Sequence, residues 1–466
     1  MSAPLRTAVA AALGLALGGL AVTTQPAALL VLAVAIAVAF SMARSPFFSL
    51  ALFVIILFAR PGDLYPALSA LRPAMLAAVG SLGVWVASKL LARDLSLADA
   101  PTNRWMTLLT VLAFLSTLTS TDRGASTTLF KDVFVKIVAL YLLILNLVNT
   151  PRRARQFRLA IAGVGAFLGS YAIHAKITGA VVEGSRAAMV GLLGDPNDLA
   201  FTLLTAAPYV ILGALKTRGR ARLGFALLGA PIVLGLVFTQ SRGGLLGLGL
   251  AVYLILRRVT QSRALTLALV LCFGGVAVVA SGMQERKSGA VGAGEIDESA
   301  QGRLDAWKAG GRMMMRRPAL GVGLGRFADN FEAYASNAVI WGKHETHNAY
   351  IKAGAEAGVV ALFAFLMLLG SATQCARRLW NHEALPGDIV DEVGIRSLLP
   401  CIAGMLVSAF FLSQCWGWFL YVMVAEIAAV ERMVRRSAAE ADRLDRIGVP
   451  RTPESCVYTP VSRWNS

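Results

Sequence analysis

The chain is dominated by apolar runs of roughly 15–24 residues, separated by short polar stretches. About 20 apolar residues let a helix cross the hydrocarbon core of a bilayer, where a helix satisfies its own backbone hydrogen bonds. Only 15% of the residues are charged, whereas a soluble globular protein carries about 25%. The pattern therefore predicts an all-α, polytopic membrane protein and excludes a set of soluble domains.

The apolar runs number about 14, and several are short enough that 12 transmembrane helices remain possible. Either even count puts both termini on the same side of the membrane. The first run follows Met1 closely but is expected to stay as an uncleaved helix, because a second run follows at once. The runs lie at about residues 7–23, 26–43, 46–59, 71–91, 104–120, 131–149, 157–175, 199–215, 222–239, 243–256, 264–282, 350–374, 397–413 and 416–431.

Basic residues in the short connections predict the orientation, since cytoplasmic loops of membrane proteins are enriched in Lys and Arg. With 14 helices the basic clusters all fall on one side, which we assign to the cytoplasm together with both termini. The clusters are Arg152, Arg153, Arg155 and Arg158; Lys216, Arg218, Arg220 and Arg222; Arg257, Arg258 and Arg263; Arg44, Arg377 and Arg378; and Arg432, Arg435 and Arg436. Despite the net charge of +17, we expect no nucleic-acid partner, because no continuous basic stripe with interleaved aromatics is present.

One long loop, at about 283–349, then faces outward and is the only region large enough to build a site in water. It contains two helix-like pieces. One spans about 301–317, and the other aligns Phe327, Phe331, Tyr334, Ala338 and Trp341 on one face, which we attribute to packing. We expect four parts: N-terminal transmembrane helices (1–189), a core that includes the loop (190–375), C-terminal transmembrane helices (376–431) and a cytoplasmic tail (432–466).

Arg242 lies where an apolar run emerges on the outer side and is followed by Gly243 and Gly244. An arginine at this depth is costly and is a functional candidate, although snorkelling from a helix end is an equal alternative. The glycines would let a phosphate approach the backbone, and a guanidinium suits phosphate oxygens.

The segment His344-Glu345-Thr346-His347-Asn348 closes the long loop. Two histidines three residues apart could bind zinc, but no further ligand stands at metal spacing, so we expect no metal and no other cofactor. A histidine at the rim of a wet cavity is a reasonable general base for a hydroxyl; an ordinary interfacial histidine is the alternative. The chain has no G-x-S-x-G and no Walker A motif, and the glycine-rich stretch 321–325 is expected to be a turn.

Two further groups of charged residues are expected on the outer side. Arg60, Asp63 and Arg72 share an early loop, and Asp63 is a rival to His347 as the base. Near another outer boundary, additional cations either extend a cationic lining or serve as ordinary anchors. These cations are Arg123, Lys131 and Lys136.

Several short motifs, which follow one another in the same order as in the family, make the chain resemble the bacterial O-antigen ligase and polymerase superfamily over about residues 190–365. Arg242 and Leu246 match its R-x3-L element, and His347-Asn348 with Gly358 match its H-N-x9-G element. The other matching elements are Asp195-Pro196-Asn197, Gly302-Arg303 with Trp307, and Pro318 with the glycine run that ends at Phe327. The N-terminal half matches only in character.

The resemblance implies a C-type glycosyltransferase architecture and an O-antigen ligase of lipopolysaccharide biosynthesis in a Gram-negative inner membrane. Its donor would be a glycan on undecaprenyl diphosphate, and its acceptor a sugar hydroxyl of the lipid A–core at the periplasmic face. By position, His347 is the catalytic candidate, Arg242 and Arg303 bind the donor diphosphate, and Asn348 supports them. Arginines would replace the metal that paired carboxylates hold in many glycosyltransferases, and the anomeric centre would be inverted.

Asp195 and Asp198 are close in sequence, but we expect them to cap the next helix rather than to hold a metal. Within the same superfamily, an O-antigen polymerase and a protein O-oligosaccharyltransferase remain alternatives, since the sequence does not identify the acceptor. A transporter of lipid-linked saccharides is the alternative of another class. It would predict inverted repeats with broken helices, which the sequence does not display.

Overall fold

The computed structural model describes residues 41, 44–260, 262–281, 298–336, 344–382 and 389–446. Within these ranges the chain is helical, and its only β-type pairing is an isolated bridge between Val182 and Arg186. The helices of the first half are α3 (Pro46–Ala59), α4 (Pro61–Leu64), α5 (Pro66–Ser69), α6 (Pro73–Leu91), α7 (Asn103–Leu118), α8 (Arg123–Leu129), η1 (Phe130–Phe134), α9 (Val135–Leu147), α10 (Pro151–Thr178), η2 (Gly191–Gly194), α11 (Pro196–Leu203), α12 (Ala207–Lys216) and α13 (Gly219–Phe238). They are followed by α14 (Arg242–Val259), α15 (Arg263–Ser281), α16 (Glu298–Arg316), α17 (Phe327–Tyr334), α19 (Ala349–Ala357), α20 (Val359–Asn381), α21 (Ile389–Ala409), η4 (Gln414–Trp416) and α22 (Trp418–Arg446).

The predicted membrane fold is confirmed. Every apolar run predicted from residue 46 onward contains a helix, while the first two runs lie almost wholly outside the described residues. In the described part of the chain, 7 helical segments are long and apolar enough to cross a membrane. The protein is therefore an all-α, polytopic membrane protein.

Glycines let the helices of the bundle approach one another closely. Gly169 of α10 packs against the backbone of Pro231 in α13, and Gly235 of α13 packs against Gly169 in turn. Gly247 of α14 and Gly404 of α21 are paired in the same way. A side chain at any of these positions would collide with the facing backbone, so the small-residue pattern sets the spacing of the bundle.

One basic residue assigned to a cytoplasmic connection lies inside the bundle instead. Helix α10 begins at Pro151, earlier than the predicted residue 157, so Arg158 belongs to its second turn and is 1% exposed. Its guanidinium lies 2.7 Å from the carboxylate of Glu426 in α22. The pair satisfies both charges away from water, which explains why this arginine does not mark the membrane boundary.

The predicted membrane segment at 350–374 is two helices rather than one. Gly358 has φ 89° and ψ 169°, and a Cβ there would collide with the backbone of Ala319 and Leu320. Helix α19 therefore ends at Ala357, and only α20 has the length of a membrane crossing. The glycine that closes the H-N-x9-G element marks this break, because few other residues adopt that backbone conformation.

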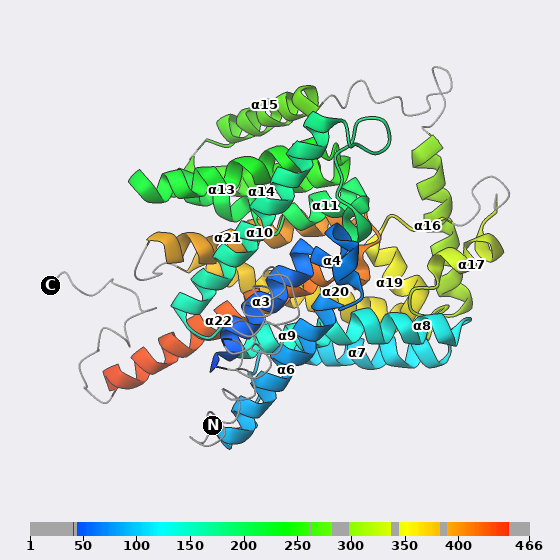
Figure 1. Ribbon diagram of the computed structural model, residues 1–466, viewed down its shortest axis with the longest axis horizontal. Helices are drawn as coiled ribbons and strands as arrows, with labels where there is room; N and C mark the ends of the chain where they lie inside the picture. Colours follow the sequence, from blue (N-terminus) through cyan, green and yellow to red (C-terminus); the bar gives the residue numbers. More distant parts are fainter. Residues whose placement is uncertain are drawn as a thin grey trace, which may run out of the picture.

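The long loop supplies α16 and α17, which lie at one end of the bundle beside α19 and α8 (Figure 1). The predicted aromatic helix is confirmed as far as Tyr334, where α17 ends; Ala338 and Trp341 lie outside the described residues. Phe327 and Phe331 are buried in a small core with α16, as a packing role predicts.

Candidate functional site

His347 lies in the short segment that leads from the long loop into α19. Its backbone has φ 46°, a left-handed conformation that is uncommon for a residue with a side chain. The backbone N–H of His347 donates to the hydroxyl of Ser413, 2.9 Å away, and the hydroxyls of Ser413 and Thr346 are 3.1 Å apart. Two segments far apart in sequence therefore fix the conformation of His347.

The helices of the long loop hold the same segment from the other side. The indole of Trp307 in α16 donates to the carbonyl oxygen of Thr346 at 3.0 Å. The His344 ring packs on Phe331 of α17 and on the ring of His347, with centroids 5.8 and 5.5 Å apart. Asn348 caps α19, because its side chain accepts from two backbone N–H groups of the first turn.

The surroundings of His347 favour the neutral imidazole. Burial lowers its pKa, and the positive charges of Arg303 and His344 lower it further. The carboxylates of Asp195 and Glu345 oppose this shift but do not overcome it. A neutral imidazole can accept a proton, and the nearby carboxylates would stabilise the imidazolium that results.

Arg303 and His347, predicted to share a site, are brought together. Arg303 lies on α16, and its charge lowers the pKa of His344 as well as that of His347. Arg242 is exposed at the first residue of α14, beside Ser241, which caps that helix. Next to it, Gly243 packs against Phe411, two residues before Ser413. The start of α14 thus lies at the same end of the bundle as the His347 segment.

A partly buried polar network connects the start of α14 to the Asp195 segment. Asn197 accepts from the hydroxyl of Ser241 and from the guanidinium of Arg186, each at 2.8 Å. Asn197 also donates to Asp195 at 2.8 Å, and Arg186 donates to the carbonyl oxygen of Thr239 at 2.9 Å. Arg186 is 2% exposed, and its role had no signal in the sequence.

Asp195 caps α11, as predicted, by accepting from the backbone N–H of Asn197. Helix capping is not the only role of the acidic residues in this segment. The carboxylate of Asp195 acts on His347 electrostatically, and Asp198 contacts the side chain of Gln414 in η4. The structure thus adds acidic side chains to the site that the sequence explained as caps only.

Lys352 and Glu356 of α19 are two further charged residues that the sequence reasoning missed. The ammonium of Lys352 lies 2.7 Å from Glu345 and 3.8 Å from Glu356, whose side chain is fully buried. The two carboxylates raise the pKa of Lys352, and Lys352 lowers the pKa of Glu345. Charged residues within a predicted membrane segment are functional candidates. Lys352 and Glu356 lie in the apolar run at 350–374, so the sequence alone could have identified them.

The Glu356 carboxylate joins the glycine-rich turn to the site. It accepts from the backbone N–H groups of Gly325 and Phe327 at 2.7 and 3.1 Å. It also accepts from the indole of Trp416 at 2.7 Å. The stretch 321–325 is a turn, as predicted, and its close contact with α19 explains why Gly321 has no room for a side chain.

Residues of the early outer loop surround a cavity of about 370 Å³. Arg60, Asp63, Arg72 and Lys136 line it together with Asp132. The guanidinium of Arg60 is paired with the carboxylate of Asp63. Lys136 of α9 therefore lines the same cavity as the early loop. The two cations grouped with it in the sequence are exposed and do not line this cavity. These are Arg123 and Lys131.

This cavity adjoins the His347 site through two contacts. Asp63 packs so tightly against Gly191 that a Cβ on the glycine would collide with its carboxyl group. Gly191 begins η2, which leads directly to Asp195. On the other side, the guanidinium of Arg60 stacks over the ring of Trp418, 5.6 Å from its centroid, just after η4.

Left-handed backbone conformations gather at this end of the molecule. Among the described residues, non-glycine positions with positive φ include Arg60, Arg72, Gln240 and His347, at 49°, 45°, 51° and 46°. Three of these are candidate site residues, and Gln240 comes two residues before Arg242. Such conformations persist where surrounding contacts enforce them, and they cluster at functional sites.

In the part of the chain that the structure describes, no three His, Cys, Asp or Glu side chains converge as a metal site would require. The described cysteines are free: Cys272, Cys375, Cys401 and Cys415. The cations at this end of the bundle are guanidinium and ammonium groups, which suit an anionic ligand.

The fold and this group of residues define a polytopic membrane protein with a candidate enzyme site at one end of its helical bundle. The family model described as O-antigen ligase matches residues 227–366, a range that includes Arg242, Arg303, His347 and Gly358. Over this range the chain is similar to the O-antigen ligase family, which supports the resemblance that its motifs predicted. No curated protein matched the chain. The family match supports a glycosyltransferase-like enzyme that acts on a lipid-linked glycan and a lipid acceptor.

Proposed function

We propose that the protein is an O-antigen ligase of lipopolysaccharide biosynthesis in a Gram-negative inner membrane. It transfers a glycan from undecaprenyl diphosphate to a sugar hydroxyl of the lipid A–core at the periplasmic face. The observation that carries the proposal is His347: it is a half-buried imidazole in an enforced conformation, and its burial and the charge of Arg303 lower its pKa. That arrangement suits a base that acts next to an anionic leaving group.

In this mechanism His347 takes the proton of the acceptor hydroxyl as its oxygen attacks the anomeric carbon. The bond between that carbon and the diphosphate oxygen breaks, and the configuration at the anomeric centre is inverted. Arg303 and Arg242 stabilise the charge that develops on the diphosphate, in place of a metal ion. Asp195, whose charge reaches His347, stabilises the imidazolium.

The cavity around Arg60, Arg72 and Lys136 is a supporting anion site in this proposal. Its contacts through Gly191 and Trp418 put it next to the Asp195 segment and η4. Asp63 remains the rival base, although its carboxylate is engaged by Arg60. Arg123 and Lys131 are proposed as membrane-surface anchors, and Asn348 as the cap that orients the segment carrying His347.

The experiment is a deletion strain complemented with the wild-type protein or with His347→Ala, analysed on a lipopolysaccharide gel. If the protein is a ligase, the uncomplemented deletion strain loses the long-chain ladder while the lipid-linked polymer accumulates. A band of core plus one repeat unit would indicate a polymerase instead. An unchanged ladder would exclude both and leave protein glycosylation or transport. The purified His347→Ala protein is expected to lose transfer by at least about a hundredfold in vitro; full activity would rule out His347 as the base.

A further inference from the structure

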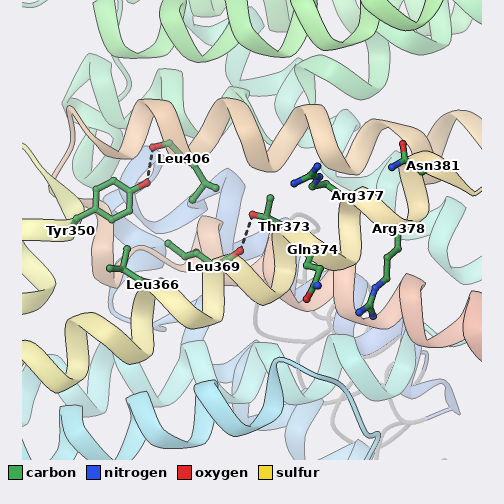
Figure 2. A pocket seen from close by; sticks show the side chains of 10 residues that line it. Tyr350, Leu366, Leu369, Thr373, Gln374, Arg377, Arg378, Asn381 and Leu406 are labelled. Carbon is green, nitrogen blue, oxygen red and sulfur yellow. Dashed lines mark hydrogen bonds between the residues drawn. The ribbon is translucent and has the colours of Figure 1, made fainter.

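A groove separate from the candidate site runs along α20 and α21. Its volume is about 870 Å³, and its lining extends from Tyr350 in α19 to Asn381 at the end of α20. Figure 2 shows the groove lengthwise, with Tyr350 at one end and the polar side chains of α20 at the other. None of the residues assigned above to catalysis or to diphosphate binding lines it.

The end near Tyr350 and the middle of the groove are uncharged. The Tyr350 hydroxyl donates to the carbonyl oxygen of Leu406, 2.8 Å away, and so engages the polar group of that side chain (Figure 2). Leu366 and Leu369 form the wall beyond it. At Gly370 a Cβ would meet no heavy atom within 4 Å, so the groove is open there. This part suits a hydrocarbon chain.

The other end of the groove is cationic. Arg377 and Arg378 line it together with Gln374 and Asn381 (Figure 2). Arg378 forms an ion pair with Glu431, whose carboxylate lies 3.4 Å from its guanidinium. Arg377 is exposed and has no ion-pair partner among the residues that the structure describes. It is therefore available to an external anion.

Two further arginines lie near this end; Arg258 adds a positive charge, whereas Arg396 is paired with Glu392. The guanidinium groups of Arg258 in α14 and Arg396 in α21 both donate to the carbonyl oxygen of Trp380, at 2.7 and 2.8 Å. Trp380 lies between Arg378 and Asn381 in sequence. Basic pockets between transmembrane helices are the usual receptors for anionic lipid headgroups.

The length of the groove matches one leaflet. Arg377 comes eleven positions after Leu366 in α20, which is about 16 Å of helix. Half of the hydrocarbon core measures about 15 Å. A chain that starts at Arg377 and ends near Leu366 would therefore reach the bilayer midplane, from the membrane surface opposite His347.

We propose that this groove is a binding site for an anionic phospholipid of the leaflet on the Arg377 side. Its phosphate is bound by Arg377, and one acyl chain lies against Leu366 and Leu369 beside Gly370. A guanidinium pairs with phosphate oxygens through two parallel hydrogen bonds, and an anionic headgroup, unlike a zwitterionic one, brings no cation that these arginines would repel. A polyprenyl diphosphate donor fits less well, because the end of the groove nearest His347 has no cation in its lining.

The test is a lipid titration of the full-length, delipidated protein in detergent, followed by native mass spectrometry. The probes are phosphatidylglycerol and phosphatidylcholine with identical acyl chains. Arg377→Gln removes the proposed phosphate contact, and Arg220→Gln, an exposed arginine at the start of α13, is its matched control. Gly370→Leu fills the groove, and Gly163→Leu, a helical glycine that also has nothing within 4 Å of its Cβ, is the second control.

The wild-type protein is expected to prefer phosphatidylglycerol by about tenfold, and Arg377→Gln to lose that preference. Gly370→Leu is expected to lose binding of both lipids at this site, while both controls behave as the wild type. Equal retention of the two lipids by the wild type, or unchanged binding by Gly370→Leu, would overturn the proposal. Loss of binding in Gly370→Leu with no headgroup preference would also overturn it, since the groove would then accept any chain. If Gly370→Leu does not fold, the comparison of Arg377→Gln with Arg220→Gln decides.

Discussion

The backbone N–H of His347 donates to the hydroxyl of Ser413 over 2.9 Å, although 66 residues separate the two positions in the chain. The bond connects the end of the long loop to the segment between α21 and η4. Because Thr346 shares the same hydroxyl, Ser413 supports both residues of the turn. The conformation of the candidate base thus depends on a residue that no motif of the sequence identifies.

Replacing Ser413 with alanine is expected to lower transfer activity by about tenfold to a hundredfold, because a small misplacement of a catalytic group has large effects on rate. The loss of stability should stay near 1 kcal/mol. Ser408→Ala is the matched control, since the buried Ser408 hydroxyl has no hydrogen-bond partner in the described part of the chain. Transfer kinetics and thermal unfolding check both variants; equal activities would show that Ser413 does not position His347.

The pH dependence of transfer should report the charges around His347. A base must be neutral, so the rate rises with pH through the pKa of His347 and is constant above it. Because burial, Arg303 and His344 lower that pKa, the midpoint of the acidic limb is expected at a lower pH than the ordinary histidine value of 6.5.

Charge variants should move this acidic limb in opposite directions. Arg303→Gln removes a positive charge and should shift the limb to higher pH, whereas Asp195→Asn should shift it to lower pH, each by on the order of one pH unit. Arg303→Gln should also raise KM for the donor. The measurement is the pH–rate profile of the purified proteins, and shifts of both variants in one direction would contradict the assignment.

A methyl group at Gly191 should disturb the contact between the early outer loop and the Asp195 segment. Gly191 has φ 67°, and its Cβ would collide with the carboxyl group of Asp63. Gly191→Ala is therefore expected to cost about 1–2 kcal/mol of backbone strain and to lower transfer at least about tenfold. In Gly194→Ala the new Cβ would meet only the carbonyl oxygen of Met189, at 3.5 Å, so this control should resemble the wild type. Equal activity of both variants would argue against a functional link through Asp63.

Glu356 is expected to matter for stability more than any other carboxylate of the site. Glu356→Ala leaves the N–H groups of Gly325 and Phe327 and the indole of Trp416 without their acceptor, and removes one of two counter-charges of Lys352. The expected cost is about 3–5 kcal/mol. Thermal unfolding in detergent measures it, with the exposed Glu332→Ala as a control. A midpoint equal to that of the control would refute the structural role of Glu356.

Membrane insertion and helical content could be predicted from the sequence, because the bilayer imposes one length and one polarity on every crossing segment. The exact helix boundaries were harder to predict from the sequence. Helix α10 begins at Pro151, before the predicted apolar run, and a buried ion pair keeps Arg158 in the bundle; the run at 350–374 is divided where a packed glycine ends α19. Those contacts involve Glu426 and Ala319, which periodicity does not connect to either position.

For the site, the sequence by itself determined the chemistry that is present: His347, Arg303 and Arg242 stand in family motifs, and the family match covers them. The tertiary structure alone decided which groups surround His347, because Ser413 and Asp195 come from separate segments. It also separated Lys136, which lines the early-loop cavity, from the exposed Arg123 and Lys131. The physical reason is that hydropathy and motifs record local preferences. The pKa of a base and the lining of a cavity, in contrast, depend on distances between residues that only packing brings together.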